Sequence, residues 1–165
     1  MSARLAAAGL ALACIGGAAA AAAPPPATLP QVVAWAQAHL RGVDDWPLLG
    51  FNPQGMTLAS PAGAALQADG MVEGDIRQEF FEPIELDGRI LRSTSGRWRV
   101  DCARQRYAIV WLKLYARNDQ REPLGERAPA APTWTPRDSF SGDIVDALCE
   151  AVRNGARLEP APARR

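Results

Sequence analysis

The sequence predicts an α+β fold: a mainly antiparallel β-sheet with a C-terminal α-helix packed on it and tied to it by a disulfide, plus a short N-terminal helix. Three observations predict this class. Residues 97–102 alternate in polarity with the period of two of a half-buried antiparallel strand. Residues 141–153 repeat apolar side chains at helical spacing. Cys102 lies in the first of these segments and Cys149 in the second.

The faces on which the two cysteines lie predict that they pair. Cys102 shares a strand face with Trp98 and Val100, and Cys149 shares a helix face with Val145. A one-sided sheet and an amphipathic helix bury these faces by packing together. A catalytic or metal-binding thiol pair is the alternative, but the two cysteines lack C-x-x-C spacing and the chain has one histidine. We therefore predict a structural disulfide.

The first 23 residues have the pattern of a secretory signal peptide. Arg4 precedes a short apolar stretch, and small residues with A-x-A spacing follow it. The apolar stretch is shorter than the roughly 20 residues that span a bilayer, so no transmembrane anchor is expected after processing. Cys14 lies among small residues, as in a lipoprotein signal, but Ala11 stands where such signals carry leucine. We expect export to the periplasm or to the outer membrane or cell surface, with a lipid anchor at Cys14 as the disfavoured alternative.

One domain, over residues 29–155, is expected between two segments without packed structure. Residues 24–28 form a Pro-rich linker, and residues 156–165 form a disordered tail rich in Pro, Ala and Arg. The domain begins with a helix over residues 29–40, where Pro30 suits the first turn.

Strand patterns fill the middle of the domain. After turn signals that begin near Asp44, strands are expected at 56–60, 64–68, 72–82, 89–93 and 97–102. Pro83 is expected to end the third of these. The best strand runs from Tyr107 to Arg117. One face of it is aliphatic: Ala108, Val110, Leu112, Leu114 and Ala116. Because its other face is also largely apolar, we predict a central strand covered on both sides by helices. An apolar face left open for a partner is the alternative.

A loop and a helix complete the domain. Residues 118–137 contain four prolines and predict a long loop. In the C-terminal helix, Ser141 is the expected N-cap, and Phe140 precedes it at the position that packs onto Val145. Asn154 and the glycine after it are expected to end the helix.

Few residues could carry chemistry. His39 is expected to be a structural residue at the end of the first helix, and a Ser-His-Asp hydrolase would have to use it. Haem ligation would need His39, Tyr107 or Tyr115. We predict no catalytic residue, no cofactor and no metal ligand.

Two charged groups are expected to be solvated strand faces. One group is acidic and consists of Glu73, Asp75, Glu79, Glu82 and Glu85. A glycosidase-like carboxylate pair or a calcium site is the alternative for this group. The other is basic and lies near Trp98 and Tyr107: Arg97, Arg99, Arg104 and Arg106. The 18 basic and 18 acidic residues balance, so no nucleic-acid partner is expected. If the basic group binds anything, a glycan or an acidic protein is the more natural partner.

The residues around the two cysteines resemble the bacterial surface-adhesin protein E family. The strand Arg99–Cys102 resembles the family's Val-Asp-Cys strand. Further matching positions are Ser93 before this strand, Arg104, Arg106 and Tyr107 after it, Tyr115 near the end of the next strand, and Trp134, Pro136 and Ser139 before the helix with Cys149. The resemblance covers about residues 70–150. It implies an exported antiparallel sheet with a C-terminal helix tied by the disulfide. Family members include adhesins that bind host matrix or serum proteins, and haem binding is associated with one.

We therefore expect an exported, non-enzymatic binding module of the bacterial envelope, adhesin-like by resemblance. Its expected partners are extracellular or host proteins or envelope components. A periplasmic, envelope-associated structural protein without a host ligand is the alternative, and a hydrolase is the third hypothesis.

Overall fold

The computed structural model describes residues 24–138 and 141–154. The predicted signal peptide, Cys14, the tail after residue 155 and the packing of Phe140 lie outside the described residues.

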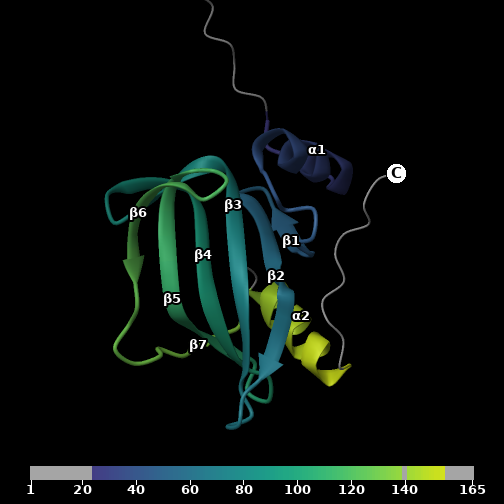
Figure 1. Cartoon of the computed structure of the whole chain (residues 1–165), viewed down its shortest axis with the longest axis vertical. Coiled ribbons are helices and arrows are strands. Elements are labelled where there is room, and N and C mark those ends of the chain that lie inside the picture. The colour runs from purple at the N-terminus through teal and green to yellow at the C-terminus, as the bar shows by residue number, and fades with distance from the viewer. Residues whose placement is uncertain (1–23, 139–140, 155–165) are drawn as a thin grey trace, which may run out of the picture.

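Within this part of the chain, a curled antiparallel sheet of seven strands is the main element (Figure 1). Its strands are β1 (Leu48–Asn52), β2 (Gly55–Leu66), β3 (Val72–Leu86), β4 (Arg89–Asp101), β5 (Arg106–Arg117), β6 (Arg121–Arg127) and β7 (Thr135–Pro136). Strands β1 to β6 lie side by side in chain order, and β7 pairs with the start of β5. The two helices are α1 (Leu29–His39) and α2 (Gly142–Arg153). The predicted α+β class, with a helix near each end of the domain, is confirmed.

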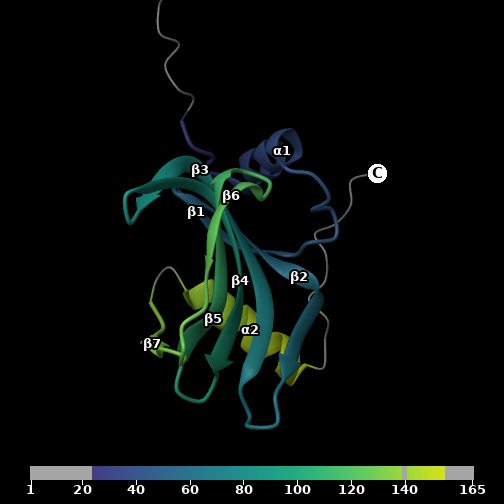
Figure 2. The ribbon, with the colours of Figure 1, turned by 60° about the vertical axis from the view of Figure 1, so that its left-hand side comes forward.

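Helix α2 covers the lower half of one sheet face (Figure 2). We call this face the α2 face. The apolar residues packed there come from β2, β3, β4 and α2: Ala59, Val72, Ile76, Trp98, Val100, Ile144, Val145, Leu148 and Cys149. The approach is close at Gly74, where a Cβ atom would lie 2.6 Å from a methyl group of Leu148. A glycine is therefore needed at this point of β3 for α2 to pack.

Helix α1 packs on residues from the upper end of the sheet (Figure 1). Val32, Ala36 and Leu40 form a second buried cluster with Met56, Leu58 and Phe81. Cross-strand pairing places Met56 opposite Glu79 and Leu58 opposite Arg77, on the face away from α2. The two helices thus bury opposite faces at different heights of the sheet.

The predicted disulfide is present. Cys102, just after β4, is joined to Cys149 of α2, with the two Cα atoms 5.8 Å apart. Cys149 is buried within the cluster under α2, and Cys102 packs at its edge. The bond fixes α2 to the α2 face, as the faces of the two segments predicted.

The region from 44 to 70 is more regular than predicted. Residues 48–52 form β1, which was not predicted, and β2 is one strand through residues 55–66 where two short strands were expected. Between Ala59 and Ala64 the pairing of β2 with β3 shifts register. This interruption of the ladder explains why the pattern indicated two pieces.

The expected end of β3 at Pro83 is wrong, since the strand continues to Leu86. The pairing with β4 shifts register between Glu79 and Ile84. Proline lacks the N–H that a regular ladder requires, and this irregular stretch is where a strand tolerates it.

The loop predicted over 118–137 is also partly wrong, because residues 121–127 form β6 beside β5. This strand lies at the edge of the sheet, where proline and charged side chains are common. Pro123 pairs opposite Tyr115, and a register shift adjoins this pair. The proline pattern therefore marked an edge strand within the predicted loop.

The predicted environment of β5 is wrong in two respects. Arg97 pairs with Trp111 and Trp98 with Ile109, so Val110 is an extra residue in a β-bulge. The bulge reverses the alternation, and the five aliphatic residues expected on one face divide between both. Several β5 side chains, including Trp111, are also only partly buried, so helices do not cover the strand on both sides.

Candidate binding surface

The side of β3, β4 and β5 that faces away from α2 carries charged and aromatic residues below the α1 cluster. We call it the open face and define it by Glu73, Asp75, Arg97, Arg99, Trp111 and Lys113. These residues pair across neighbouring strands, Glu73 with Arg99, Asp75 with Arg97 and Arg97 with Trp111, which places them on one side of the sheet. The described residues that pack against α2 lie on the other side.

Ion pairs order the arginines of the open face. Arg97 binds Asp75 through two hydrogen bonds, from Nε to Oδ1 at 2.8 Å and from Nη2 to Oδ2 at 3.0 Å. These hydrogen bonds, together with the carboxylate charge, raise the pKa of Arg97 above its usual value. Arg99 bridges Glu73, at 3.3 Å, and Asp69. The pairing fixes the guanidinium groups in place, whereas each exposed pair contributes little stability.

Aromatic rings lie beside cations here and at the lower edge of the sheet. The Lys113 ammonium is 5.6 Å from the centre of the Trp111 ring and 3.5 Å from Glu126 of β6. The Arg106 guanidinium lies 4.6 Å from the centre of the Trp134 ring. Both tryptophans are partly exposed, so they offer apolar area beside positive charge.

Asp101 anchors the turn that leads from β4 to β5. Its carboxylate is buried and accepts hydrogen bonds from the backbone and side chain of Arg104 and from Arg106 Nε, at 3.0–3.1 Å. Burial alone would raise the pKa of Asp101, but the bonds to the two arginines outweigh it and lower the pKa. The predicted arginine cluster is therefore divided: Arg97 and Arg99 lie on the open face, while Arg104 and Arg106 hold the turn.

The prediction of a wholly solvated acidic face is wrong at Glu79, which is fully buried. Its carboxylate accepts hydrogen bonds from Arg77 Nε at 2.7 Å, from Ser93 Oγ at 2.9 Å and from Asn118 Nδ2 at 3.0 Å. Arg77 also donates to Asp119 at 3.0 Å. This cluster joins β3, β4 and the β5–β6 turn beside α1. The backbone N–H of Asp119 donates to the same carboxylate at 3.1 Å. The partners from β4 and the β5–β6 turn lie 14 to 40 residues from Glu79, so no local pattern marked it.

His39 lies at the end of α1, where the sequence placed it. Its Nδ1 is 2.8 Å from the Trp35 carbonyl oxygen, and its ring stacks on the Trp35 ring at a centroid distance of 4.5 Å. These contacts are consistent with the expected structural role.

The two tyrosines considered as haem ligands have contacts different from those of His39. Tyr107 stacks on Trp98, with ring centres 4.6 Å apart. Burial is the main cause that raises the pKa of Tyr107, and the negative charge of Asp138 adds to it. Tyr115 is buried, with its hydroxyl 3.3 Å from Ser95 Oγ. Among the described residues, no cluster of three or more His, Cys, Asp or Glu side chains could hold a metal ion. Neither α1 nor α2 is long and apolar enough to cross a membrane.

Comparison with solved structures finds two partial likenesses. Both are structures of Haemophilus influenzae protein E, one of them in crystal form II. That structure has 14% identity and a TM-score of 0.46, and the match covers 70% of this chain and 92% of that one. The second has 13% identity and a TM-score of 0.44, and the match covers 70% and 89%. No protein-family model matches the chain, and no curated protein matches it in sequence. At these identities and TM-scores the likeness assigns no function and no ligand to this chain.

Proposed function

We propose that this chain is an exported, non-enzymatic binding module of the bacterial envelope that contacts a protein partner through the open face. The observation that carries the proposal is the placement of Trp111, which is partly exposed between Arg97, its cross-strand neighbour, and Lys113. Tryptophan and arginine are the residue types enriched at the energetic centres of protein interfaces. Ion-paired arginines are already ordered, so they lose little side-chain freedom on binding.

The charges of the open face favour a partner of mixed charge. Asp75 and Glu73 alternate with Arg97 and Arg99 on neighbouring strands. Such a pattern sets the orientation of a partner with the complementary pattern rather than attracting any polyanion. We propose extracellular or host proteins, or envelope components, as the partner class, with adhesion as the role. The disulfide suits such a protein, because these bonds persist in oxidising compartments.

The experiment is a pull-down with the oxidised full-length chain as bait, against both host matrix and serum proteins and solubilised envelope. Trp111→Ala and Asp146→Asn serve as matched baits, since Asp146 lies on α2, away from the open face. The proposal expects a specific protein that wild type and Asp146→Asn retain and Trp111→Ala loses. Equal capture by all three baits would contradict it.

A second function is favoured by the same ion pairs. Since Asp75 and Glu73 already satisfy Arg97 and Arg99, the open face can also be a stable outer surface with no ligand. The protein would then be a periplasmic, envelope-associated structural component. Protease treatment of intact cells separates the two: digestion supports surface exposure and adhesion, while protection until the outer membrane is opened supports the structural role.

A Ser-His-Asp hydrolase would need His39, whose Nδ1 lies beside the Trp35 carbonyl oxygen where a triad would place a carboxylate. If a preparation shows hydrolysis, His39→Ala should leave the rate unchanged. A loss of turnover without loss of folding would contradict the non-enzymatic proposal.

A further inference from the structure

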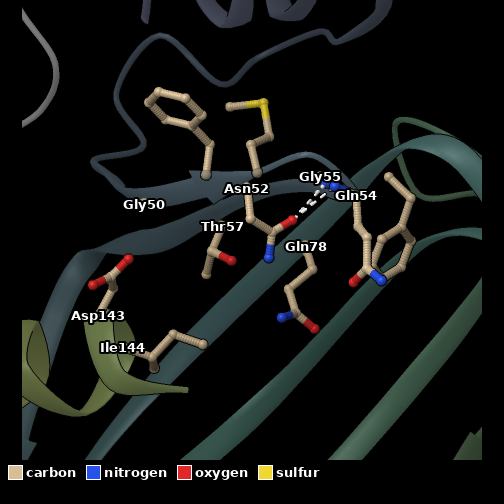
Figure 3. Close-up of a pocket in the computed structure, with 11 residues that line it drawn as sticks. Gly50, Asn52, Gln54, Gly55, Thr57, Gln78, Asp143 and Ile144 are labelled. Atoms are coloured by element: carbon tan, nitrogen blue, oxygen red, sulfur yellow. Dashed lines mark hydrogen bonds between the residues drawn. The ribbon is translucent and has the colours of Figure 1, made fainter. Parts of the chain in front are cut away.

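A small polar pocket lies on the α2 face, between the first turn of α2 and strands β1 to β3 (Figure 3). Its volume is about 80 Å³. That is room for about two or three water molecules or for one edge of a larger ligand. The polar side chains that line it are Asn52, Gln54, Thr57, Gln78 and Asp143. The pocket lies on the opposite side of the sheet from the open face, so binding there is independent of the proposed protein partner.

Gln78 supplies an unpaired amide in the wall of this pocket. The residue is 8% exposed, and its Oε1 accepts a hydrogen bond from Thr94 Oγ1 at 3.2 Å. Among the buried side-chain nitrogen and oxygen atoms of the described residues, Gln78 Nε2 is the one without a hydrogen-bond partner. Reversing the amide would pair Nε2 with Thr94 and leave Oε1 unpaired instead, so the wall keeps one unpaired amide atom in either orientation. A buried polar group of this kind is normally satisfied by a partner, which here is an ordered water or a group of a ligand.

Asn52 is held so that it offers a second donor. Its Oδ1 accepts hydrogen bonds from the backbone N–H groups of Gln54 at 2.8 Å and Gly55 at 3.1 Å. The oxygen is therefore occupied by the β1–β2 turn, and the Nδ2 group is directed toward Gln78 (Figure 3). The Thr57 hydroxyl, which can donate and accept, lines the pocket between them.

Asp143 places a carboxylate at the same pocket, from the first turn of α2. The side chain fits against β1 because residue 50 is glycine: a Cβ atom there would lie 2.5 Å from Asp143 Oδ2. The Asp143 carboxylate repels an anion and accepts hydrogen bonds, whereas the amide N–H groups opposite it donate them. The lining therefore suits a group that both accepts and donates hydrogen bonds.

We propose that this pocket binds adjacent hydroxyl groups of a sugar. Each hydroxyl can accept from an amide N–H and donate to a carboxylate oxygen, so a vicinal pair can satisfy Gln78, Asn52 and Asp143 together. A primary amide supplies a single acceptor oxygen for the same donors, which makes it the poorer match. Only the edge of one sugar ring enters a pocket of this size, and the rest of the saccharide lies outside.

The test is an NMR titration of the ¹⁵N-labelled, oxidised full-length chain. The probes are D-galactose, D-mannose, L-fucose and N-acetyl-D-glucosamine, with acetamide as the primary-amide comparison. The expected result is a saturable shift of the side-chain amide signals of Gln78 and Asn52 with at least one sugar. No saturable shift with any sugar, which is the result for a pocket that holds water only, overturns the proposal. So does a shift with acetamide alone.

Variants separate binding from folding. Asp143→Asn should weaken the sugar affinity by about tenfold, as expected for the loss of a charge-assisted hydrogen bond. Asp146→Asn, on the same helix and paired with Arg137 outside the pocket, should leave it unchanged. Gln78→Met keeps the length of the side chain without its amide, and should abolish binding while the protein melts no lower than wild type. Equal affinity in Asp143→Asn and Asp146→Asn, or in Gln78→Met and wild type, overturns the assignment.

Discussion

Loss of the Cys102–Cys149 disulfide should destabilise this protein by about 4 kcal/mol, without changing its folded structure. The bond joins residues 47 positions apart. In the chain-entropy model, removing a cross-link that closes a loop of that length lowers the free energy of the unfolded chain by about 4 kcal/mol at 25 °C, because the chain gains conformational entropy. Domains of this size have free energies of unfolding of about 5–15 kcal/mol, so the loss is a large part of the total.

The assay is urea unfolding of the oxidised wild type and of the Cys102→Ala/Cys149→Ala variant, followed by circular dichroism and tryptophan fluorescence. The variant should keep the folded-state spectrum, because the cluster that surrounds Cys149 remains. Its denaturant slope should rise, since the unfolded chain without the cross-link exposes more surface. Wild type after reduction serves as the control and should unfold with the variant.

A loss below about 1 kcal/mol would refute this reasoning, because the cross-link would then not restrict the unfolded chain as its loop length requires. A reduced wild type as stable as the oxidised protein would refute it independently.

Three further predictions concern stability. Glu79→Ala should lower the free energy of unfolding by about 3–5 kcal/mol, measured by urea unfolding, because it leaves Arg77 buried without the Glu79 carboxylate. A loss below about 1 kcal/mol would contradict the stabilising role of the buried cluster. Gly74→Ala should cost about 1–3 kcal/mol by crowding Leu148, and unchanged stability would contradict the close approach of α2. The pKa of Asp101 is lower in the folded protein than in the unfolded chain, where it is near 4. The Asp101 carboxylate therefore stabilises the fold fully above about pH 4, and this stabilisation is lost as the pH falls through the folded-state pKa. Asp101→Asn should therefore flatten the acid side of the stability–pH curve, and a curve parallel to wild type would contradict this.

The sequence predicted the parts of this fold that have local patterns. The alternation around Cys102 and the helical spacing around Cys149 placed both cysteines on buried faces, and the structure joins them. Helix α1 begins and ends within one residue of its predicted bounds. These features depend on residues close to one another in the chain, which periodicity can report.

The features that were missed depend on distant contacts. Val110 is an extra residue only relative to β4, and two apolar faces gave no sign of a bulge. Strand β6 is stabilised by pairing with β5, although its proline and charges are typical of a loop. In the sequence, Glu79 resembles any solvated carboxylate, because Ser93 of β4 and Asn118 of the β5–β6 turn contact it only in the folded structure. The open face and the pocket beneath α2 arise from the same long-range pairing, so the sequence suggested their residue types without their arrangement.

The central claim is that the open face is the binding surface, and hydrogen exchange of the complex with a captured partner tests it most directly. The account predicts that the partner slows exchange in β4 and β5 around Arg97 and Trp111, and leaves α1 and α2 unchanged. Protection confined to α1 or α2, or none in β4 and β5, would contradict it.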